Sequence, residues 1–286
     1  MSIILQTLVN SLITSSFYML IAVGLTLVFG VMNIANFAHG EFYMVGAYTV
    51  WLLYSVGKIP FFVSVLVALV VVCAIGVVAE RVLFRRVYGN VLGGFIISIG
   101  LVFILQVLVG QIWGVGMMKP VPKVFPGSLS VLGISVGWQR FIVVPCTGFL
   151  LAVLWFFLAK TKTGRGLRAV AQDREAAILH GIDVNRCCAV AMGLGSAMAA
   201  AGGALMAPIV SVYPYMGHSV VWTGFVIVIV GGAGNIKGTI LSALFFGFLH
   251  TIVATVLDST IGNLVGVLCM LIILAIKPEG LAGERE

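Results

Sequence analysis

Charged side chains are scarce in this sequence. Of its 286 residues, 9% are Asp, Glu, Lys or Arg, whereas 61% are hydrophobic. A soluble globular protein has about a quarter charged residues and roughly half apolar ones. The scarcity of charge therefore excludes a water-soluble protein, a disordered chain and a disulfide scaffold. It indicates that lipid surrounds most of the chain.

The motifs of common catalytic and nucleotide sites are also missing. The only Gly-Lys pair, Gly57-Lys58, is followed by Ile59 and belongs to no phosphate-binding loop. His39 and Glu41 lie two residues apart, but a third metal ligand is missing, and no Ser/His/Asp set stands out. The five cysteines lie in or beside apolar stretches without a C-x-x-C pair. We therefore predict no enzymatic site, no metal and no cofactor.

The excess of basic residues does not indicate a nucleic-acid partner. The net charge is +7, from 16 basic and 9 acidic residues. The first basic residue is Lys58, and the others occur in short clusters between apolar runs. A nucleic-acid-binding protein gathers its basic residues along one face or stripe. Clusters that flank apolar runs are instead typical of membrane topology.

Apolar runs long enough to cross a membrane recur along the whole chain. A spanning helix needs about 20 mostly apolar residues. We therefore predict an all-α, polytopic integral membrane protein, a single domain over residues 1–286, with eight to nine membrane segments. At least one segment is expected to be broken or re-entrant, because polar residues or glycines interrupt the apolar pattern near 33–41 and 231–234. The expected segments are 5–29, 42–56, 61–79, 91–113, 141–159, 187–208, 220–232, 239–257 and 261–276.

The distribution of Lys and Arg predicts the orientation of the chain. The connections around residues 81–86 and 160–186, together with Lys237 and the C-terminal tail, hold 12 of the 16 basic residues. Cytoplasmic loops are enriched in Lys and Arg, so we expect these connections and the C-terminus in the cytoplasm. The N-terminus lies outside if all nine segments span the membrane, and inside if one of them is re-entrant. The largest outer connection, 114–139, is either a plain loop or a rigid edge for an external partner.

The spacing of small residues predicts close helix packing. Gly195, Ala199 and Gly203 recur every four residues, a pattern that lets helix backbones approach closely in lipid. A faint internal likeness links residues 24–33 to residues 224–235, since both have two glycines followed by Asn-Ile. It is a weak sign of duplicated halves.

The basic connection over residues 160–186 is longer than a simple link requires. Asp173 is suited to cap the start of a short helix, Glu175 suits its positive end, and Gly181 suits a left-handed cap at its end. A two-turn helix is not stable alone in water, so it must pack either against its own protein or against a partner. The side chains expected to form its exposed apolar surface are Ala176, Ala177, Ile178 and Leu179.

Four polar residues follow the first apolar run: Asn33, Asn36, His39 and Glu41. An ionisable group within the bilayer is costly, so it faces protein or a water-filled path. The two asparagines are expected to satisfy backbone groups freed by a broken helix. His39 and Glu41 either line a translocation path or tie this element to a neighbouring helix.

Four motifs in the same order resemble one family. Residues 174–182 resemble the coupling loop of permeases in ATP-binding-cassette (ABC) importers. Residues 36–41, followed by Met44, Gly46, Ala47 and Tyr48, resemble the second-segment signature of LivH-type permeases for branched-chain amino acids. Residues 231–238 and 277–283 match further landmarks of these permeases.

The resemblance implies a permease subunit of an ABC importer in the bacterial inner membrane. It implies a second, LivM-like permease subunit, two cytoplasmic ATPase subunits and a periplasmic substrate-binding protein as partners, besides membrane lipid. Leucine, isoleucine and valine are the implied substrates. Urea, short amides or sugars on the same scaffold, or an ion-coupled secondary transporter, remain alternatives. The implied ATPase-coupling residues are Arg165, Arg168, Asp173, Glu175, Ala176, Ala177, Leu179 and Gly181.

Overall fold

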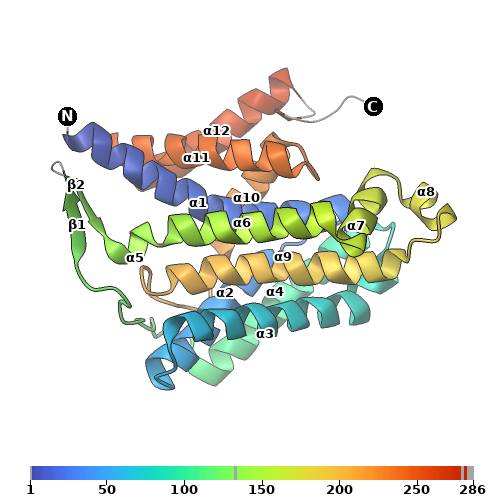
Figure 1. The fold of residues 1–286 in the computed structure, drawn as a ribbon, viewed down its shortest axis with the longest axis horizontal. Helices are drawn as coiled ribbons and strands as arrows, with labels where there is room; N and C mark the ends of the chain where they lie inside the picture. The colour runs from blue at the N-terminus through green and yellow to red at the C-terminus, as the bar shows by residue number, and fades with distance from the viewer. Residues whose placement is uncertain (1, 132–133, 278–279, 282–286) are drawn as a thin grey trace.

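The computed structural model describes residues 2–131, 134–277 and 280–281 as a bundle of long helices with one small hairpin (Figure 1). Among these residues, seven helices are long and apolar enough to cross a membrane. The predicted all-α membrane fold is therefore confirmed. The seven are α1 (Ser2–Met32), α3 (Phe61–Val82), α4 (Val91–Trp113), α6 (Val143–Lys160), α9 (Val184–Met206), α11 (Ile236–Val256) and α12 (Ser259–Ile276).

Two further apolar elements are shorter. Helix α2 (His39–Val50) has 12 residues and continues into a π-helical turn, η1 (Trp51–Val56). Helix α10 (Gly217–Gly231) has 15 residues. The chain is non-helical between α1 and α2, where Asn33 has a φ of 51°. The interruptions expected near residues 33–41 and 231–234 are thus present, whereas the total of eight to nine spans stays a prediction.

Helix α9 forms the centre of the bundle and packs against α1, α2 and α3. In its most apolar stretch 83% of the residues are buried, against 6% in α12. A Cβ added to Gly195 would lie 2.7 Å from the Gly24 carbonyl oxygen of α1, and one on Gly193 would lie 2.8 Å from a methyl of Val77 on α3. These distances confirm that small residues let the helix backbones approach closely.

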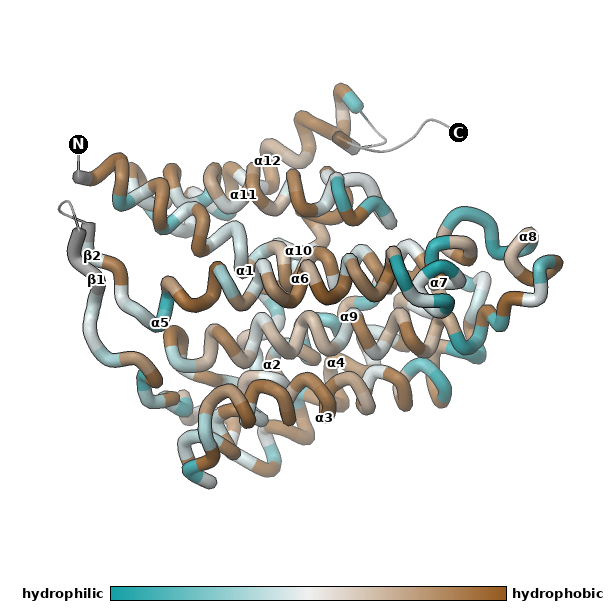
Figure 2. The backbone as a smooth tube through the Cα atoms, in the orientation of Figure 1, coloured by the Kyte–Doolittle hydropathy of each residue, from teal (hydrophilic) through white to brown (hydrophobic). Residues whose placement is uncertain are grey.

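The outer helices present apolar side chains outward. Phe103 on α4, Phe149 on α6 and Leu268 on α12 are all exposed. Figure 2 shows the long helices as predominantly apolar, with hydrophilic segments gathered at their ends. An exposed apolar surface of this extent is stable in lipid and not in water.

The two ends of the bundle differ. One carries α7 (Lys162–Gln172) and α8 (Arg174–Leu179), whereas the N-terminus and the hairpin of β1 (Ser128–Val131) and β2 (Ile134–Gly137) lie at the other (Figure 1). The strands are antiparallel, with Ser128 paired to Gly137. The 114–139 connection therefore contains a hairpin that the sequence did not predict. Two short elements complete the fold, η2 (Phe84–Val87) and α5 (Trp138–Phe141).

Candidate functional site

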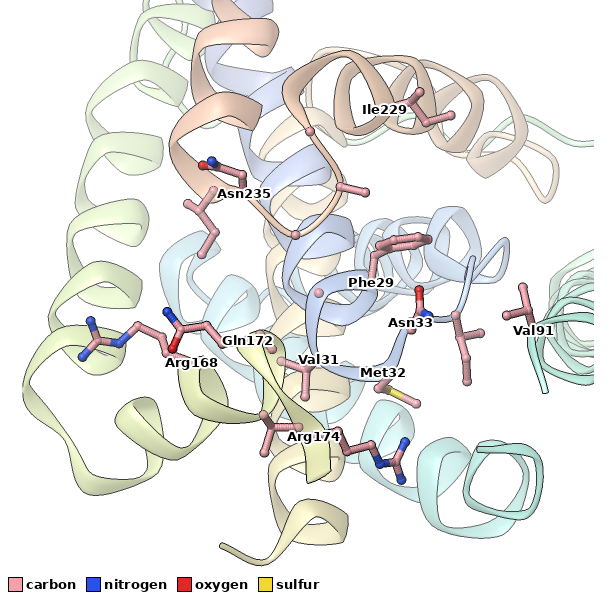
Figure 3. A pocket seen from close by; sticks show the side chains of 18 of the residues that line it. Phe29, Val31, Met32, Asn33, Val91, Arg168, Gln172, Arg174, Ile229 and Asn235 are labelled. Carbon is pink, nitrogen blue, oxygen red and sulfur yellow. The ribbon is translucent and has the colours of Figure 1, made fainter. Parts of the chain in front are cut away.

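A cavity of about 1400 Å³ opens at the α7–α8 end of the bundle (Figure 3). Its walls come from four parts of the chain: the end of α1 over 29–34, the start of α4 over 89–91, the end of α7 with Arg174, and the loop between α10 and α11 over 232–237 together with Ile229 of α10. These segments are far apart in the sequence, so only the fold brings them together.

Within this wall, the two segments that resemble each other in sequence lie close together. A Cβ added to Gly30 at the end of α1 would lie 2.9 Å from the Gly234 Cα after α10. The loop turns here through Gly232 and Gly234, whose φ angles are 93° and 87°. Such positive values favour glycine. The glycines of both segments therefore shape one side of the cavity.

The charged side chains at the cavity are all cationic. Arg168, Arg174 and Lys237 line it, and among the described residues no carboxylate does. Arg168 and Lys237 are exposed, and Arg174 is partly buried. Asn33, Asn90 and Gln172 add polar groups to the lining. The arrangement suits a passage for polar molecules that carry an anionic group.

Helix α7 begins where the hydroxyl of Thr161 accepts a hydrogen bond from the backbone N–H of Gly164 at 2.9 Å. Gly164, Leu167 and Val170 recur every three residues and are all buried. This spacing forms the buried stripe of an amphipathic helix. Arg165 and Arg168 point away from the buried stripe, toward solvent. No helix was predicted over these residues, although the three-residue spacing of Gly164, Leu167 and Val170 is a helical signal.

Helix α8 has the caps that the sequence predicted. The carboxylate of Asp173 accepts a hydrogen bond from the Ala176 N–H at 2.9 Å. Gly181 follows the helix with a φ of 75°, the left-handed conformation expected there. Glu175 lies exposed in the first turn, where a negative charge is favourable.

The expected exposed face of α8 is partly wrong. Ala177 is 3% exposed and packs within the core cluster of the bundle, and Ala176 is partly buried. Leu179 and Ile178 are 87% and 55% exposed. A helix this short is stable only when one of its sides packs against the protein. The small side chain of Ala177 allows that close packing. The apolar surface left to a partner is therefore Ile178 and Leu179.

Of the four predicted path residues, only Asn33 lines the cavity. Asn36 is buried, and its side-chain oxygen accepts a hydrogen bond from the Ala38 N–H at 3.1 Å, so it satisfies a freed backbone group as expected. His39 donates from Nε2 to the Ile21 carbonyl of α1 at 3.1 Å. These contacts hold the start of α2 in place.

Glu41 is buried at 1% exposure, and its Oε1 accepts a hydrogen bond from the Gln106 side chain of α4 at 2.9 Å. Within the described part of the chain, the second carboxylate oxygen of Glu41 and Nδ1 of His39 have no hydrogen-bond partner. The contacts of His39 and Glu41 therefore join α2 to α1 and α4, away from the cavity.

The sequence did not indicate that Arg174, Lys237 and the 232–235 loop belong to this site. Their signal was indirect: Arg174 is the first residue of the predicted coupling motif, 174–182, and the glycines at 231–234 mark an interrupted segment. Nothing in the sequence pattern indicated that both would meet the end of α1.

The described residues thus form a helix bundle with an outward apolar surface, a cavity lined by cationic side chains at one end and a basic helical segment beside that cavity. The chain belongs to the family described as "Branched-chain amino acid transport system / permease component", whose profile matches residues 7–276. The resemblance to LivH-type permeases is thereby confirmed.

Similar proteins match over nearly the whole chain. The high-affinity branched-chain amino acid transport system permease protein BraD of Pseudomonas aeruginosa is 30% identical over 299 residues, which cover 99% of this chain and 96% of BraD. LivH of Escherichia coli K12, described in the same words, is 30% identical with the same two coverages.

Among solved structures, PsaBC from Streptococcus pneumoniae in complex with Fab matches with a TM-score of 0.54 and 16% identity. The match covers 96% of this chain and 92% of the other. At this identity the likeness establishes a shared fold.

Proposed function

We propose that the protein is the permease subunit of an ATP-driven importer of leucine, isoleucine and valine, and that it forms half of the translocation path. The observation that carries the proposal is the exposed apolar tip of α8 beside the cavity. Leu179 is 87% exposed at the end of the bundle where basic residues gather. The names of the full-length relatives support the substrate.

The α7–α8 segment is the proposed docking site for cytoplasmic ATPase subunits. Ile178 and Leu179 supply an apolar contact, and an exposed apolar side chain outside the lipid gains free energy when a partner covers it. Ala177 supports the helix from inside, while Asp173 and Gly181 fix its ends. The charged or half-exposed residues proposed to surround the contact are Arg165, Arg168, Glu175 and Ala176.

The cavity is proposed to be the cytoplasmic part of the path. An amino acid carries a carboxylate at neutral pH, and Arg168, Arg174 and Lys237 make this opening attractive to it. Asn33 forms part of the wall. His39 and Glu41 are proposed to hold α2 in position instead of selecting the substrate, because their contacts are with Ile21 and Gln106.

The remaining partners follow from the same proposal. The hairpin end of the bundle faces the periplasm and receives substrate from a substrate-binding protein, and a second, LivM-like permease completes the path. The α7–α8 end and the C-terminus face the cytoplasm of a bacterium, as the basic residues predict. ATP hydrolysis is assigned to the partner ATPases, and this chain contributes no nucleotide site.

Replacing Leu179 with Glu tests the docking site. Leu179 is exposed, so the variant should insert and fold as the wild type does. A carboxylate placed in an apolar contact is buried without a partner, which is costly. We expect ATPase subunits to fail to co-purify and uptake of labelled leucine to stop. Leu179→Met, which keeps an apolar side chain, is the matched control and should retain both. Normal ATPase binding by Leu179→Glu would refute the docking site.

A further inference from the structure

A buried carboxylate lies at the α7–α8 end of α3. Glu80 is fully buried, and its two oxygens accept hydrogen bonds from Arg85 Nε at 3.2 Å and from Arg85 Nη2 at 3.0 Å. A buried charge is tolerated only with such partners. Arg85 lies in η2, directly after α3, so the pair fixes the turn between α3 and α4.

Tyr88 is the second partner of Glu80, because its hydroxyl donates a hydrogen bond to Glu80 Oε1. Burial, together with the hydrogen bond to Glu80, raises the pKa of the Tyr88 hydroxyl, so it stays protonated and able to donate at neutral pH. The same side chain packs against the core cluster that contains Cys188, near the start of α9. Tyr88 therefore joins α3 to the central helix.

The ring of Tyr88 also contacts helix α8. The guanidinium of Arg174 lies 4.8 Å from the centroid of the Tyr88 ring, which is cation–π geometry. Arg174 is the first residue of α8 and also lines the cavity. A continuous series of contacts thus runs from α8 through Arg174 and Tyr88 to Glu80 on α3.

Helix α8 has only six residues and one buried side chain, Ala177. Because so short a helix has little stability of its own, its position depends on its contacts with the bundle. Ala177 packs in the core cluster, and Arg174 lies over the Tyr88 ring. The Arg174–Tyr88 contact therefore ties the orientation of α8 to the end of α3.

We propose that Arg174 and Tyr88 are positioning residues that transmit movement of the ATPase-docked α8 to α3 and α9, with Glu80 as the anchor. The proposal rests on the proposed function, since α8 must dock to the ATPase for its movement to be driven. This transmitting role differs from a purely structural role of Arg174 and Tyr88 in one measurable quantity. A broken link should lower the amount of substrate moved per ATP hydrolysed, while ATPase binding and hydrolysis persist.

The test uses the complete complex with its ATPases and binding protein in proteoliposomes, and measures leucine uptake and ATP hydrolysis together. Tyr88→Leu and Arg174→Gln should retain bound ATPase and lower the uptake-to-hydrolysis ratio about threefold to tenfold. Arg174→Lys keeps a cation over the ring and should stay within about twofold of wild type. Arg86→Gln, an exposed neighbour outside the network, is the matched control and should leave the ratio unchanged.

The double variant shows whether the two residues act as a unit. If they do, Tyr88→Leu combined with Arg174→Gln should lower the ratio no further than the worse single variant. An unchanged ratio in both single variants, or losses that multiply in the double variant, would overturn the proposal. Should Tyr88→Leu fail to insert, an unchanged ratio in Arg174→Gln still overturns the proposal, because its partly exposed side chain tolerates replacement. The Leu179→Glu variant separates the two proposals. ATPase retention there refutes docking, whereas an unchanged ratio in the Arg174 variant refutes only the link.

Discussion

Gly30 and Gly234 meet at the cavity with no room for a side chain between them: a Cβ on Gly30 would lie 2.9 Å from the Gly234 Cα. Gly30 lies in the last turn of the long helix α1, and Gly234 lies in the loop that leads into α11. The pair therefore joins α1, the first helix of the chain, to the loop between α10 and α11.

Replacing Gly30 with Val should lower the stability of the permease by about 1–3 kcal/mol, because the added atoms overlap backbone that has no rotamer to change. Thermal unfolding of the purified permease in detergent measures the loss. Gly100→Ala on α4 is the control, since nothing lies within 4 Å of its added Cβ. It should be neutral or slightly stabilising, because alanine favours helix over glycine. Equal unfolding temperatures for Gly30→Val and wild type would contradict the close contact.

The Glu41–Gln106 hydrogen bond predicts a loss of stability without a change of substrate. Glu41→Ala leaves the buried amide of Gln106 without its acceptor, at a cost of about 1–3 kcal/mol. We expect less assembled complex and slower uptake, with an unchanged leucine-to-valine preference. Glu41→Gln, which retains an acceptor oxygen, should be milder. A reversed preference in competition assays with labelled leucine would show that Glu41 selects the substrate.

Cysteine labelling tests the orientation. In a chain freed of its native cysteines, Ser128→Cys on β1 should react with a membrane-impermeant maleimide in intact spheroplasts. Arg165→Cys on α7 should react only after the membrane is opened, because positive residues stay cytoplasmic. Both positions are exposed, so burial does not explain a difference between them. Reaction of Arg165→Cys from outside would invert the topology.

The membrane helices were predictable because each depends on local composition. The apolar run predicted at 91–113 coincides with α4, Val91–Trp113. The caps of α8 were predictable for the same reason, since Asp173 and Gly181 act on backbone within a few residues of themselves. A signal confined to neighbouring residues is available in the sequence.

The missed features depend on contacts between distant residues or on short, weak patterns. Helix α7 has just three buried residues in its stripe, within a basic segment that reads as a solvated loop. A two-turn helix does not reveal which side it buries, so Ala177 was placed on the wrong face. The cavity requires residues near 30, 170 and 234 together, and no local pattern encodes that meeting.

Uptake of labelled leucine into proteoliposomes tests the central claim most directly. The complete complex, with both permeases, both ATPases and the binding protein, should accumulate leucine against its gradient when ATP is present. Unlabelled valine or isoleucine should compete, and urea, acetamide or ribose should not. The isolated chain, or the complex without ATP, should show no accumulation. Concentrative leucine uptake by this chain alone, or driven by an ion gradient without ATP, would contradict the account.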